Sequence, residues 1–312
     1  MSNVEPRPLD PQAFPESTAS APGMRVITAD TTPRFGSVAL GVPYAQKSGR
    51  TLHLQVILPP RPLAIPDTAD DVYPALLWIQ GSAFHEQDLG HKLPALADFA
   101  RRGYVVAIVE YRPSEVAPFP AQAKDAKTAV RWLREHAARF HVDPDRIVLG
   151  GDSSGGHTAL MTYVTQDDQD YSDEPVADEL GICCFIAFYP VTDITTMHDQ
   201  PSALDHVSAD SPEGYLIGRH NVLERPDLVA PTVIANHVAP AAERPLQPLL
   251  MMHGSRDRLV PFAQSVELYE RLVAAGQDVT LYQLKGADHG GPPFWQPPVT
   301  EIMDAFIRRH LP

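Results

Sequence analysis

The sequence predicts an α/β fold in which a mostly parallel sheet is covered by helices on both faces. Short apolar runs alternate with longer amphipathic stretches, as βαβ units require. The later runs, such as Ile147–Leu149, are almost wholly apolar, which is typical of strands buried on both faces. The 312 residues, 44% of them hydrophobic, are enough for a large core, either as one large domain or as two ordinary ones.

The predicted strands are short runs bounded by turn residues. They are Leu52–Leu58, Ala75–Ile79, Val105–Val109, Ile147–Leu149, Ile182–Phe188, Leu249–Met252 and Val279–Leu284. The predicted helices repeat apolar residues every three or four positions. They are Lys92–Arg102, Gln122–Phe140, Ser154–Thr165, Phe262–Ala275 and Val299–His310.

Two segments depart from this alternation. Residues 1–23 are rich in Pro, Ser and Ala and predict an extended or disordered arm, so that residues 24–312 form the main domain. Residues 191–245 are polar and rich in Pro, Asp and His. A stretch of this length inside a domain is usually functional, and we expect a cap with small helices over the carboxyl end of the sheet.

Composition narrows the possible partners and location. The formal net charge of −14 argues against nucleic acid and against an anionic membrane surface. The chain has no apolar run long enough to span a bilayer and no basic, apolar leader, which indicates a cytoplasmic protein. A secreted chain trimmed of its signal peptide would look the same. The two cysteines are adjacent, so a disulfide between them is not expected.

A Gly-x-Ser-x-Gly motif spans Gly151–Gly155, with Ser153 at its centre. It follows the apolar run Ile147–Leu149 and precedes a helical pattern, which is the strand, turn and helix context of a nucleophile elbow. The flanking glycines permit the close backbone approach that this turn requires. The motif therefore predicts that Ser153 is a nucleophile. The alternative is a plain helix N-cap, which needs no glycine on both sides.

A serine hydroxyl needs a base, and after a nucleophile elbow the partners follow in the order serine, acid, histidine. Among the 13 histidines, His289 lies in a glycine-rich loop directly after the last strand and is the predicted base. Asp257, in the loop leaving Leu249–Met252, is the predicted acid that fixes the tautomer of His289. Asp278 would emerge at the wrong end of the sheet and Asp288 would have to fold back on its neighbour, so both are expected to be solvated.

An oxyanion site needs donors from the loop after an early strand as well as from the nucleophile turn. The small residues Gly81-Ser82-Ala83 follow the strand Ala75–Ile79 and Gln80. We expect the backbone N–H groups of Ser82 and Ala83 to act together with that of Ser154, at the start of the next helix. The alternative is an ordinary turn, since Gly-Ser pairs are common in turns.

Several other polar and aromatic residues lie near these motifs. Aromatic residues on loops near these motifs are expected to line an acyl pocket, with core packing as the alternative. They are Phe84, Tyr111, Phe119, Phe294 and Trp295.

His157, one helical turn after Ser153, is expected to pack or cap rather than to act as a second base. A polar cluster lacks zinc-like spacing and no phosphate-binding glycine loop is present, so neither a metal nor another cofactor is expected. The cluster is His85, Glu86, Asp88 and His91.

Three motifs in combination resemble a known family. They are Gly-Asp-Ser-Ser-Gly-Gly, His-Gly-Ser-Arg-Asp-Arg-Leu-Val-Pro and Lys-Gly-Ala-Asp-His-Gly-Gly. From about Pro74 to its C-terminus the chain resembles the bacterial carboxylesterases of the α/β-hydrolase fold related to hormone-sensitive lipase, above all the branch with the bacterial feruloyl esterases. Ser-Pro-Glu-Gly-Tyr-Leu-Ile-Gly at 211–218 is similar to that branch too.

The resemblance implies a triad of Ser153, Asp257 and His289 acting on small to medium esters, with feruloyl, hydroxycinnamoyl or acetylated-sugar esters among the candidates. The chain departs from most relatives at Gln80-Gly81-Ser82-Ala83, where they have His-Gly-Gly-Gly. The backbone donors survive this change, but the shape and polarity of the pocket do not follow from the family. Fold alone does not choose a substrate.

The residues together predict a serine esterase that works by two-step acyl transfer on a small-molecule ester. Two alternatives stay open. A prolyl-oligopeptidase-like peptidase usually carries a large propeller or a long N-terminal extension, for which this chain has no room. A small-molecule receptor on an inactive hydrolase fold typically lacks a triad member. The oligomeric state stays open, a dimer included.

Overall fold

The computed structural model describes residues 14–29, 34–62, 71–176 and 180–312. The chain divides into two compact units, Met1–Pro33 and Arg34–Pro312. The predicted arm falls in the first unit, and the division comes after residue 33 rather than after residue 23. Residues 1–13 of the arm lie outside the described residues, and residues 14–29 contain neither helix nor strand.

An eight-stranded sheet forms the centre of the second unit, in the order β1-β2-β4-β3-β5-β6-β7-β8. Strands β3 to β8 pair in parallel, whereas β2 pairs antiparallel with both β1 and β4. The predicted mostly parallel sheet is therefore confirmed. The strands are β1 (Arg34–Lys47), β2 (Arg50–Pro62), β3 (Tyr73–Ile79), β4 (Val105–Val109), β5 (Val142–Asp152), β6 (Ile182–Phe188), β7 (Leu249–Gly254) and β8 (Val279–Leu284).

Strand β1 was missed by the sequence analysis. It is an edge strand with three register shifts against β2, and it contains Gly36, Gly41 and Pro43. Such bulges interrupt the two-residue alternation that marks a strand. Proline is tolerated in β1 because, among the described strands, only β2 pairs with it. The hairpin closes through Ser48 and Gly49, which both have positive φ, as a type I′ turn requires.

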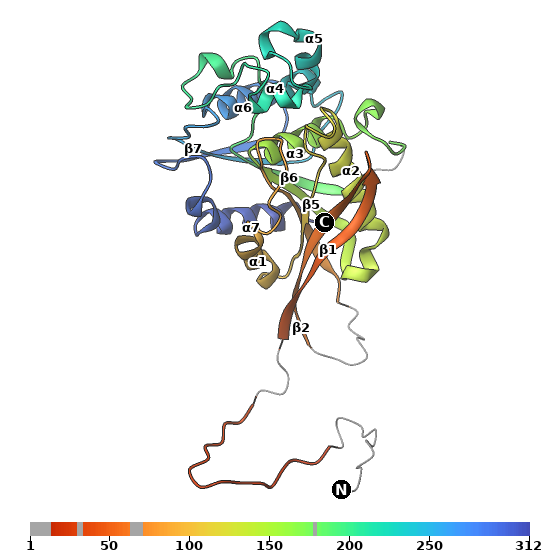
Figure 1. Cartoon of the computed structure of the whole chain (residues 1–312), viewed down its shortest axis with the longest axis vertical. Helices are drawn as coiled ribbons and strands as arrows, with labels where there is room; N and C mark the ends of the chain where they lie inside the picture. The colour runs from red at the N-terminus through yellow and green to blue at the C-terminus, as the bar shows by residue number, and fades with distance from the viewer. Residues whose placement is uncertain (1–13, 30–33, 63–70, 177–179) are drawn as a thin grey trace. The chain divides into compact units, whose positions relative to one another are not determined.

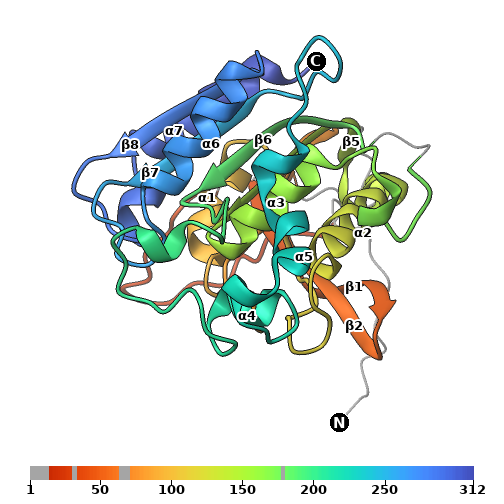
Figure 2. The same ribbon diagram turned by 90° about the horizontal axis from the view of Figure 1, so that it is seen from above.

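Helices cover both faces of the sheet (Figures 1 and 2). Helices α2, α3 and α6 pack on one face, while α1 and α7 pack on the other. The predicted helix Gln122–Phe140 ends early, because α2 stops at Glu135 and a short 3₁₀ turn, Ala137–Phe140, follows. The helices are α1 (Leu93–Arg101), α2 (Ala121–Glu135), α3 (Ser154–Val164), α4 (Pro212–Leu216), α5 (Pro226–Val229), α6 (Ala263–Ala274) and α7 (Val299–His310).

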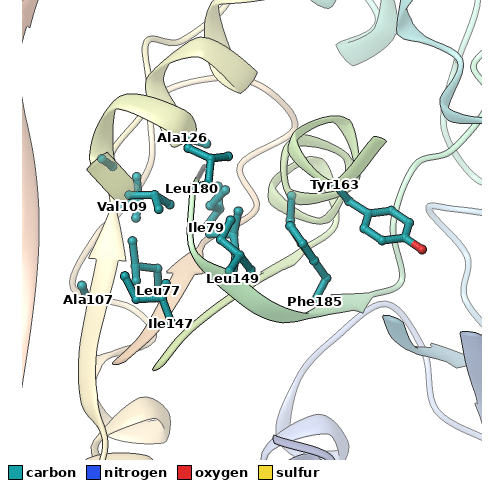
Figure 3. Close-up of a cluster of buried hydrophobic side chains, with 14 of the residues drawn as sticks. Leu77, Ile79, Ala107, Val109, Ala126, Ile147, Leu149, Tyr163, Leu180 and Phe185 are labelled. Carbon is teal, nitrogen blue, oxygen red and sulfur yellow. The ribbon is translucent and has the colours of Figure 1, made fainter. Parts of the chain in front are cut away.

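The largest core lies between the sheet and the helices α2, α3 and α6. Figure 3 shows strand residues such as Leu77, Val109 and Leu149 beneath Ala126 of α2. Tyr163 of α3 lies to one side, next to Phe185 of β6. Burying side chains on both faces fixes the central strands in place, so the carboxyl ends of β3, β5, β7 and β8 meet at one edge. In open α/β sheets this edge is where ligands bind. None of the described helices is long and apolar enough to cross a bilayer.

The segment 191–245 contains the small helices that the sequence analysis expected, α4 and α5, which lie side by side (Figures 1 and 2). It has an apolar cluster of its own, which also includes Phe84 and Val260 from the loops after β3 and β7. The insertion therefore packs directly on two loops that leave the carboxyl edge of the sheet.

Candidate active site

Ser153 stands at a strained turn between β5 and α3. Its φ of 55° and ψ of −124° lie outside the regions that L-residues favour. The surrounding backbone enforces the turn, since a Cβ on Gly155 would lie 2.0 Å from the carbonyl oxygen of Ile79. The nucleophile elbow predicted from the motif is present, and it places the hydroxyl at the carboxyl edge of the sheet.

His289 connects the serine to the predicted acid. Its Nε2 lies 2.9 Å from Ser153 Oγ, and its Nδ1 lies 2.7 Å from Oδ2 of Asp257. A carboxylate only accepts hydrogen bonds, so Nδ1 carries the proton and the lone pair of Nε2 faces the serine hydroxyl. The three side chains thus lie in the predicted line, in the tautomer that lets the imidazole remove the serine proton.

Asp257 is held on all sides by donors. Oδ1 accepts the backbone N–H groups of Leu259 and Val260, both at 2.9 Å. Oδ2 lies 3.1 Å from Nε2 of the buried His253, in addition to its contact with His289. Burial alone would raise the pKa of Asp257, but hydrogen bonds from the two histidines outweigh it and hold the pKa well below its usual range. The carboxylate is therefore ionised and fixed in orientation.

His253, which is buried near the end of β7, supports Asp257. Its Nε2 lies 3.0 Å from the carbonyl oxygen of Val260, and its Nδ1 lies 2.8 Å from the hydroxyl of Ser265. The rival acids lie elsewhere, as expected. Asp288 pairs with Arg258 at 2.6 Å, and Asp278 precedes β8, at the opposite end of that strand from His289.

The loop after β3 lies against the nucleophile turn, because a Cβ on Gly81 would come 2.5 Å from the carbonyl oxygen of Asp152. The N–H of Ser82 donates to Oγ of Ser154 at 2.9 Å, so this predicted oxyanion donor is already engaged. Within the described part of the chain, the N–H groups of Ala83 and Ser154 make no hydrogen bond. Two of the three predicted donors, Ala83 and Ser154, are therefore free to bind an oxyanion. The prediction for Ser82 is wrong, because its N–H already has a partner.

Tyr111 supports the oxyanion loop instead of lining a pocket. Its hydroxyl lies 2.8 Å from Oγ of Ser82 and 3.1 Å from Oγ of Ser154. Burial raises its pKa to about 12, so the phenol stays protonated. Ala83 and Phe84 have φ of 55° and 64°, a conformation that glycine adopts more readily. Ala83 and Phe84 are thus held in a strained turn directly after the residue that Tyr111 contacts, Ser82.

A cavity of about 330 Å³ opens beside Ser153 and His289. Its walls come from the oxyanion loop, the loops after β7 and β8, and the insertion. Of the five aromatic residues predicted to line it, only Phe84 does so. Four predictions are therefore wrong, those for Tyr111, Phe119, Phe294 and Trp295.

The misplaced aromatics belong to the core. A 3₁₀ turn, Pro292–Trp295, directs Phe294 and Trp295 beneath the sheet edge, where their rings meet Phe188 and Trp78. Phe119 packs instead against His157 and Tyr171. Phe294 and Trp295 follow His289 closely in sequence, but their rings pack against the core instead of lining the cavity.

His157 packs as expected. It is fully buried on α3, and its Nε2 lies 2.9 Å from the carbonyl oxygen of Thr232 in the insertion. Two of the four members of the polar cluster pair with other residues, His85 with Glu115 and Glu86 with Arg50, and His91 lines the cavity. Among the described residues, no three His, Cys, Asp or Glu side chains converge as metal ligands.

Several polar residues of the cavity wall escaped the sequence analysis. Lys92 is largely buried, with Nζ 3.4 Å from Oδ2 of Asp152, and Asp152 also accepts a hydrogen bond from Nε1 of Trp78 at 2.7 Å. On the insertion side, His206 and Glu213 line the same cavity. Glu213 stands in the segment 211–218 that resembles the family, which was the one available signal.

The fold and the site define this chain as an α/β hydrolase with a serine, a histidine and an aspartate aligned at the carboxyl edge of its sheet. Comparison with known proteins agrees with this class. The chain belongs to the BD-FAE family, whose model matches residues 62–272.

The similar curated proteins are esterases and lipases by name. The chain is 27% identical over 220 residues to Esterase LipC of Mycobacterium tuberculosis, which covers 70% of this chain and 53% of LipC. It is 27% identical over 248 residues to Lipase 2 of Moraxella sp., covering 69% of this chain and 54% of that protein. The chain thus spans about half the length of the curated relatives it matches.

Solved structures share nearly the whole fold. A truncated form of a carbohydrate esterase from gut microbiota superposes with a TM-score of 0.74 at 25% identity, covering 90% of this chain and 98% of that one. Esterase 2 of Thermogutta terrifontis, phosphonylated by sarin, gives a TM-score of 0.68 at 25% identity, with coverage of 88% and 94%. The arrangement of strands and helices is therefore that of known esterases.

Proposed function

We propose that this chain is a serine carboxylic-ester hydrolase that works through an acyl-enzyme. The observation that supports it is the line from Ser153 Oγ through His289 to Asp257, with contacts of 2.9 and 2.7 Å, beside an accessible cavity. In this proposal Ser153 is the nucleophile, His289 the general base and acid, and Asp257 the group that fixes the imidazole.

The reaction runs in two steps. Ser153 Oγ attacks the ester carbonyl carbon while Nε2 of His289 takes its proton, and the N–H groups of Ala83 and Ser154 donate to the oxyanion. The tetrahedral intermediate collapses, and the alcohol leaves with the proton from His289. Water then attacks the acyl-enzyme, with His289 again as base, and releases the acid and the free serine.

The proposed substrates are small to medium esters. A cavity of about 330 Å³ lies near the lower limit of small-molecule pockets. Acetylated-sugar esters and feruloyl or hydroxycinnamoyl esters are the finer candidates. The former gain support from the similar structure, which is titled a carbohydrate esterase.

The proposal is tested with 4-nitrophenyl esters from acetyl to octanoyl, a feruloyl ester, and an aryl-amide peptide substrate. We expect ester turnover, with Ser153→Ala lowering kcat/KM at least about 10⁴-fold and Ser17→Ala, in the N-terminal unit, changing nothing. Paraoxon should add one phosphoryl group to the wild type and none to Ser153→Ala by intact mass. Turnover that survives Ser153→Ala contradicts the mechanism, and faster amide than ester cleavage favours a peptidase.

A further inference from the structure

A buried ion pair stands in the wall that the insertion contributes to the cavity. His206 is 3% exposed, and Glu213, in the first turn of α4, is 2% exposed. Nδ1 of His206 lies 3.1 Å from Oε2 of Glu213, and both residues line the cavity that contains Ser153. The pair therefore ties α4 to the segment before it, beside the nucleophile.

A hydroxyl on the other side of the ring determines where a neutral His206 carries its proton. Oγ of Ser202 lies 3.0 Å from the carbonyl oxygen of Leu259 and 3.3 Å from that of Arg258, which can only accept. The single proton of the hydroxyl is directed at these oxygens, so Nε2 of His206, at 2.7 Å, donates to Oγ. In a neutral ring Nδ1 is then a lone pair that faces the carboxylate.

The contact between His206 and Glu213 is therefore complete only when the pair holds one further proton. Placed on Nδ1, this proton makes an imidazolium that pairs with the carboxylate. Placed on Glu213, it makes an acid that donates to Nδ1. Without it, two acceptors oppose each other where they are buried, which is costly because water cannot supply the missing donor.

Other titratable groups on the surrounding loops already have partners of their own, at 2.6 to 3.4 Å. They are Arg258 with Asp288, Lys92 with Asp152, and His289 with Asp257. Asp205, next to His206 in the chain, is exposed and accepts the backbone N–H groups of two following residues. His91 lines the cavity but is exposed. Among the described residues, Glu213 is thus the ion-pair partner of His206.

We propose that His206 and Glu213 form a proton-dependent clamp, which positions the insertion wall of the cavity while the pair holds its proton and releases it at alkaline pH. This rests on the proposed ester hydrolysis. The segments that the clamp connects are residues 202–206, α4 and the loop after β7, and each contributes to the cavity wall. His206 and Glu213 act here as positioning residues, because they hold the wall against which the substrate lies.

The catalytic triad and the clamp predict opposite effects of pH on kcat/KM. His289 acts as a base only when it is deprotonated, so the triad alone gives a kcat/KM that rises with pH and then levels off. The closed clamp binds one proton more than the open one. Its contribution is therefore complete at low pH and is lost as the pH rises. Together they give a profile that rises and then falls.

The test measures kcat/KM for 4-nitrophenyl butyrate across this pH range, corrected for spontaneous hydrolysis. We expect the wild type to lose at least about fivefold between its maximum and about pH 9.5. Glu213→Gln should abolish this loss, because an amide N–H donates to Nδ1 of the neutral ring without a shared proton. Glu224→Gln, on an exposed residue of the same insertion, should keep it.

Ser202→Ala gives an independent check on the same clamp. Without the hydroxyl, Nε2 of His206 loses the acceptor that fixes its proton. The neutral ring can then carry the proton on Nδ1 and donate it to Glu213. The alkaline loss of kcat/KM should therefore shrink in this variant as well.

The outcomes separate the clamp from the proposed function. A wild type that cleaves the ester without an alkaline decline overturns the clamp. So does a Glu213→Gln variant with the full wild-type decline, which would assign the decline to another group such as Lys92. A wild type that cleaves no ester contradicts the proposed function itself. If Glu213→Gln does not fold, the wild-type profile and Ser202→Ala carry the same comparison.

Discussion

His157 shows how one buried side chain links two parts of the site. It stands on α3, directly behind Ser153, and its Nε2 donates to the carbonyl oxygen of Thr232 in the insertion. Burial lowers its pKa from 6.5 to about 4. The folded chain therefore keeps the ring neutral at a pH where the unfolded chain would already protonate it.

This shift predicts a loss of stability in mild acid. Between pH 6.5 and about 4, His157 binds a proton in the unfolded chain but not in the folded chain. The stabilisation that the neutral, buried His157 gives the fold is therefore complete above pH 6.5 and is lost as the pH falls. In urea unfolding, the free-energy gap between wild type and His157→Gln should narrow by up to about 3 kcal/mol from pH 7 to pH 4. If the difference in the free energy of unfolding between wild type and His157→Gln does not change with pH, this account is wrong.

At the scale of residues, motif order was enough to find the aligned serine, histidine and aspartate. The fold determines which strand ends lie together, so Ser153, Asp257 and His289 followed from their places after strands. Glu213 and His206 did not, because the insertion has no regular period from which its path can be calculated. Their chemistry appears only once the folded chain brings them to the cavity.

Among the elements, the turn from β5 to α3 packs very tightly against the end of β3. A Cβ on Gly155 would lie 2.0 Å from a backbone oxygen of β3, whereas one on the neighbouring Gly156 would lie 3.0 Å from the side chain of Pro190. At Gly155 the backbone of β3 would have to move far enough to distort the sheet, whereas at Gly156 the neighbours, which include the carbonyl oxygen of Phe188 at 3.2 Å, need to yield only slightly.

We therefore expect Gly155→Ala to lower the free energy of unfolding by more than about 3 kcal/mol, and Gly156→Ala by about 1 kcal/mol. Thermal and urea unfolding of both variants measure the difference. Equal effects would mean that the turn relaxes more freely than the close approach to Ile79 suggests.

Regular patterning decided which elements could be predicted from the sequence. Val105–Val109, Ile182–Phe188 and Val279–Leu284 were predicted with the bounds that they have in the structure. The first two are central strands, apolar throughout, and the flanking turns mark their ends. Strand β1 gave no such signal, because an edge position permits bulges, glycine and proline that a central strand would not.

On the scale of the whole molecule, one ion cluster joins the edge hairpin to the helical layer. Asp125 of α2 is fully buried and accepts hydrogen bonds from the guanidinium of Arg112, which follows β4, at 2.8 to 3.1 Å. Lys47, at the end of β1, lies 3.5 Å away, and Ser48 in the hairpin turn accepts from Arg112 at 3.1 Å. Removing one partner leaves the others charged and enclosed.

Asp125→Asn should therefore lower the free energy of unfolding by about 3 to 5 kcal/mol. Asp210→Asn, which breaks the exposed pair with Arg219, should lower the free energy of unfolding far less, because solvent screens that pair. Chemical denaturation of the two variants at one pH compares them directly. Similar small effects would show that the hairpin is held by its apolar contacts alone.

The hydrogen bonds of Asp257 determine where the proton that His289 takes from Ser153 can go. Its two oxygens already receive four contacts, from Leu259, Val260, His253 and His289, which occupy about all the lone pairs that a carboxylate offers. No acceptor position is left for water or for a further relay. A proton taken from the serine therefore stops at the imidazole, and its only exit is back across the reacting bond to the departing alcohol.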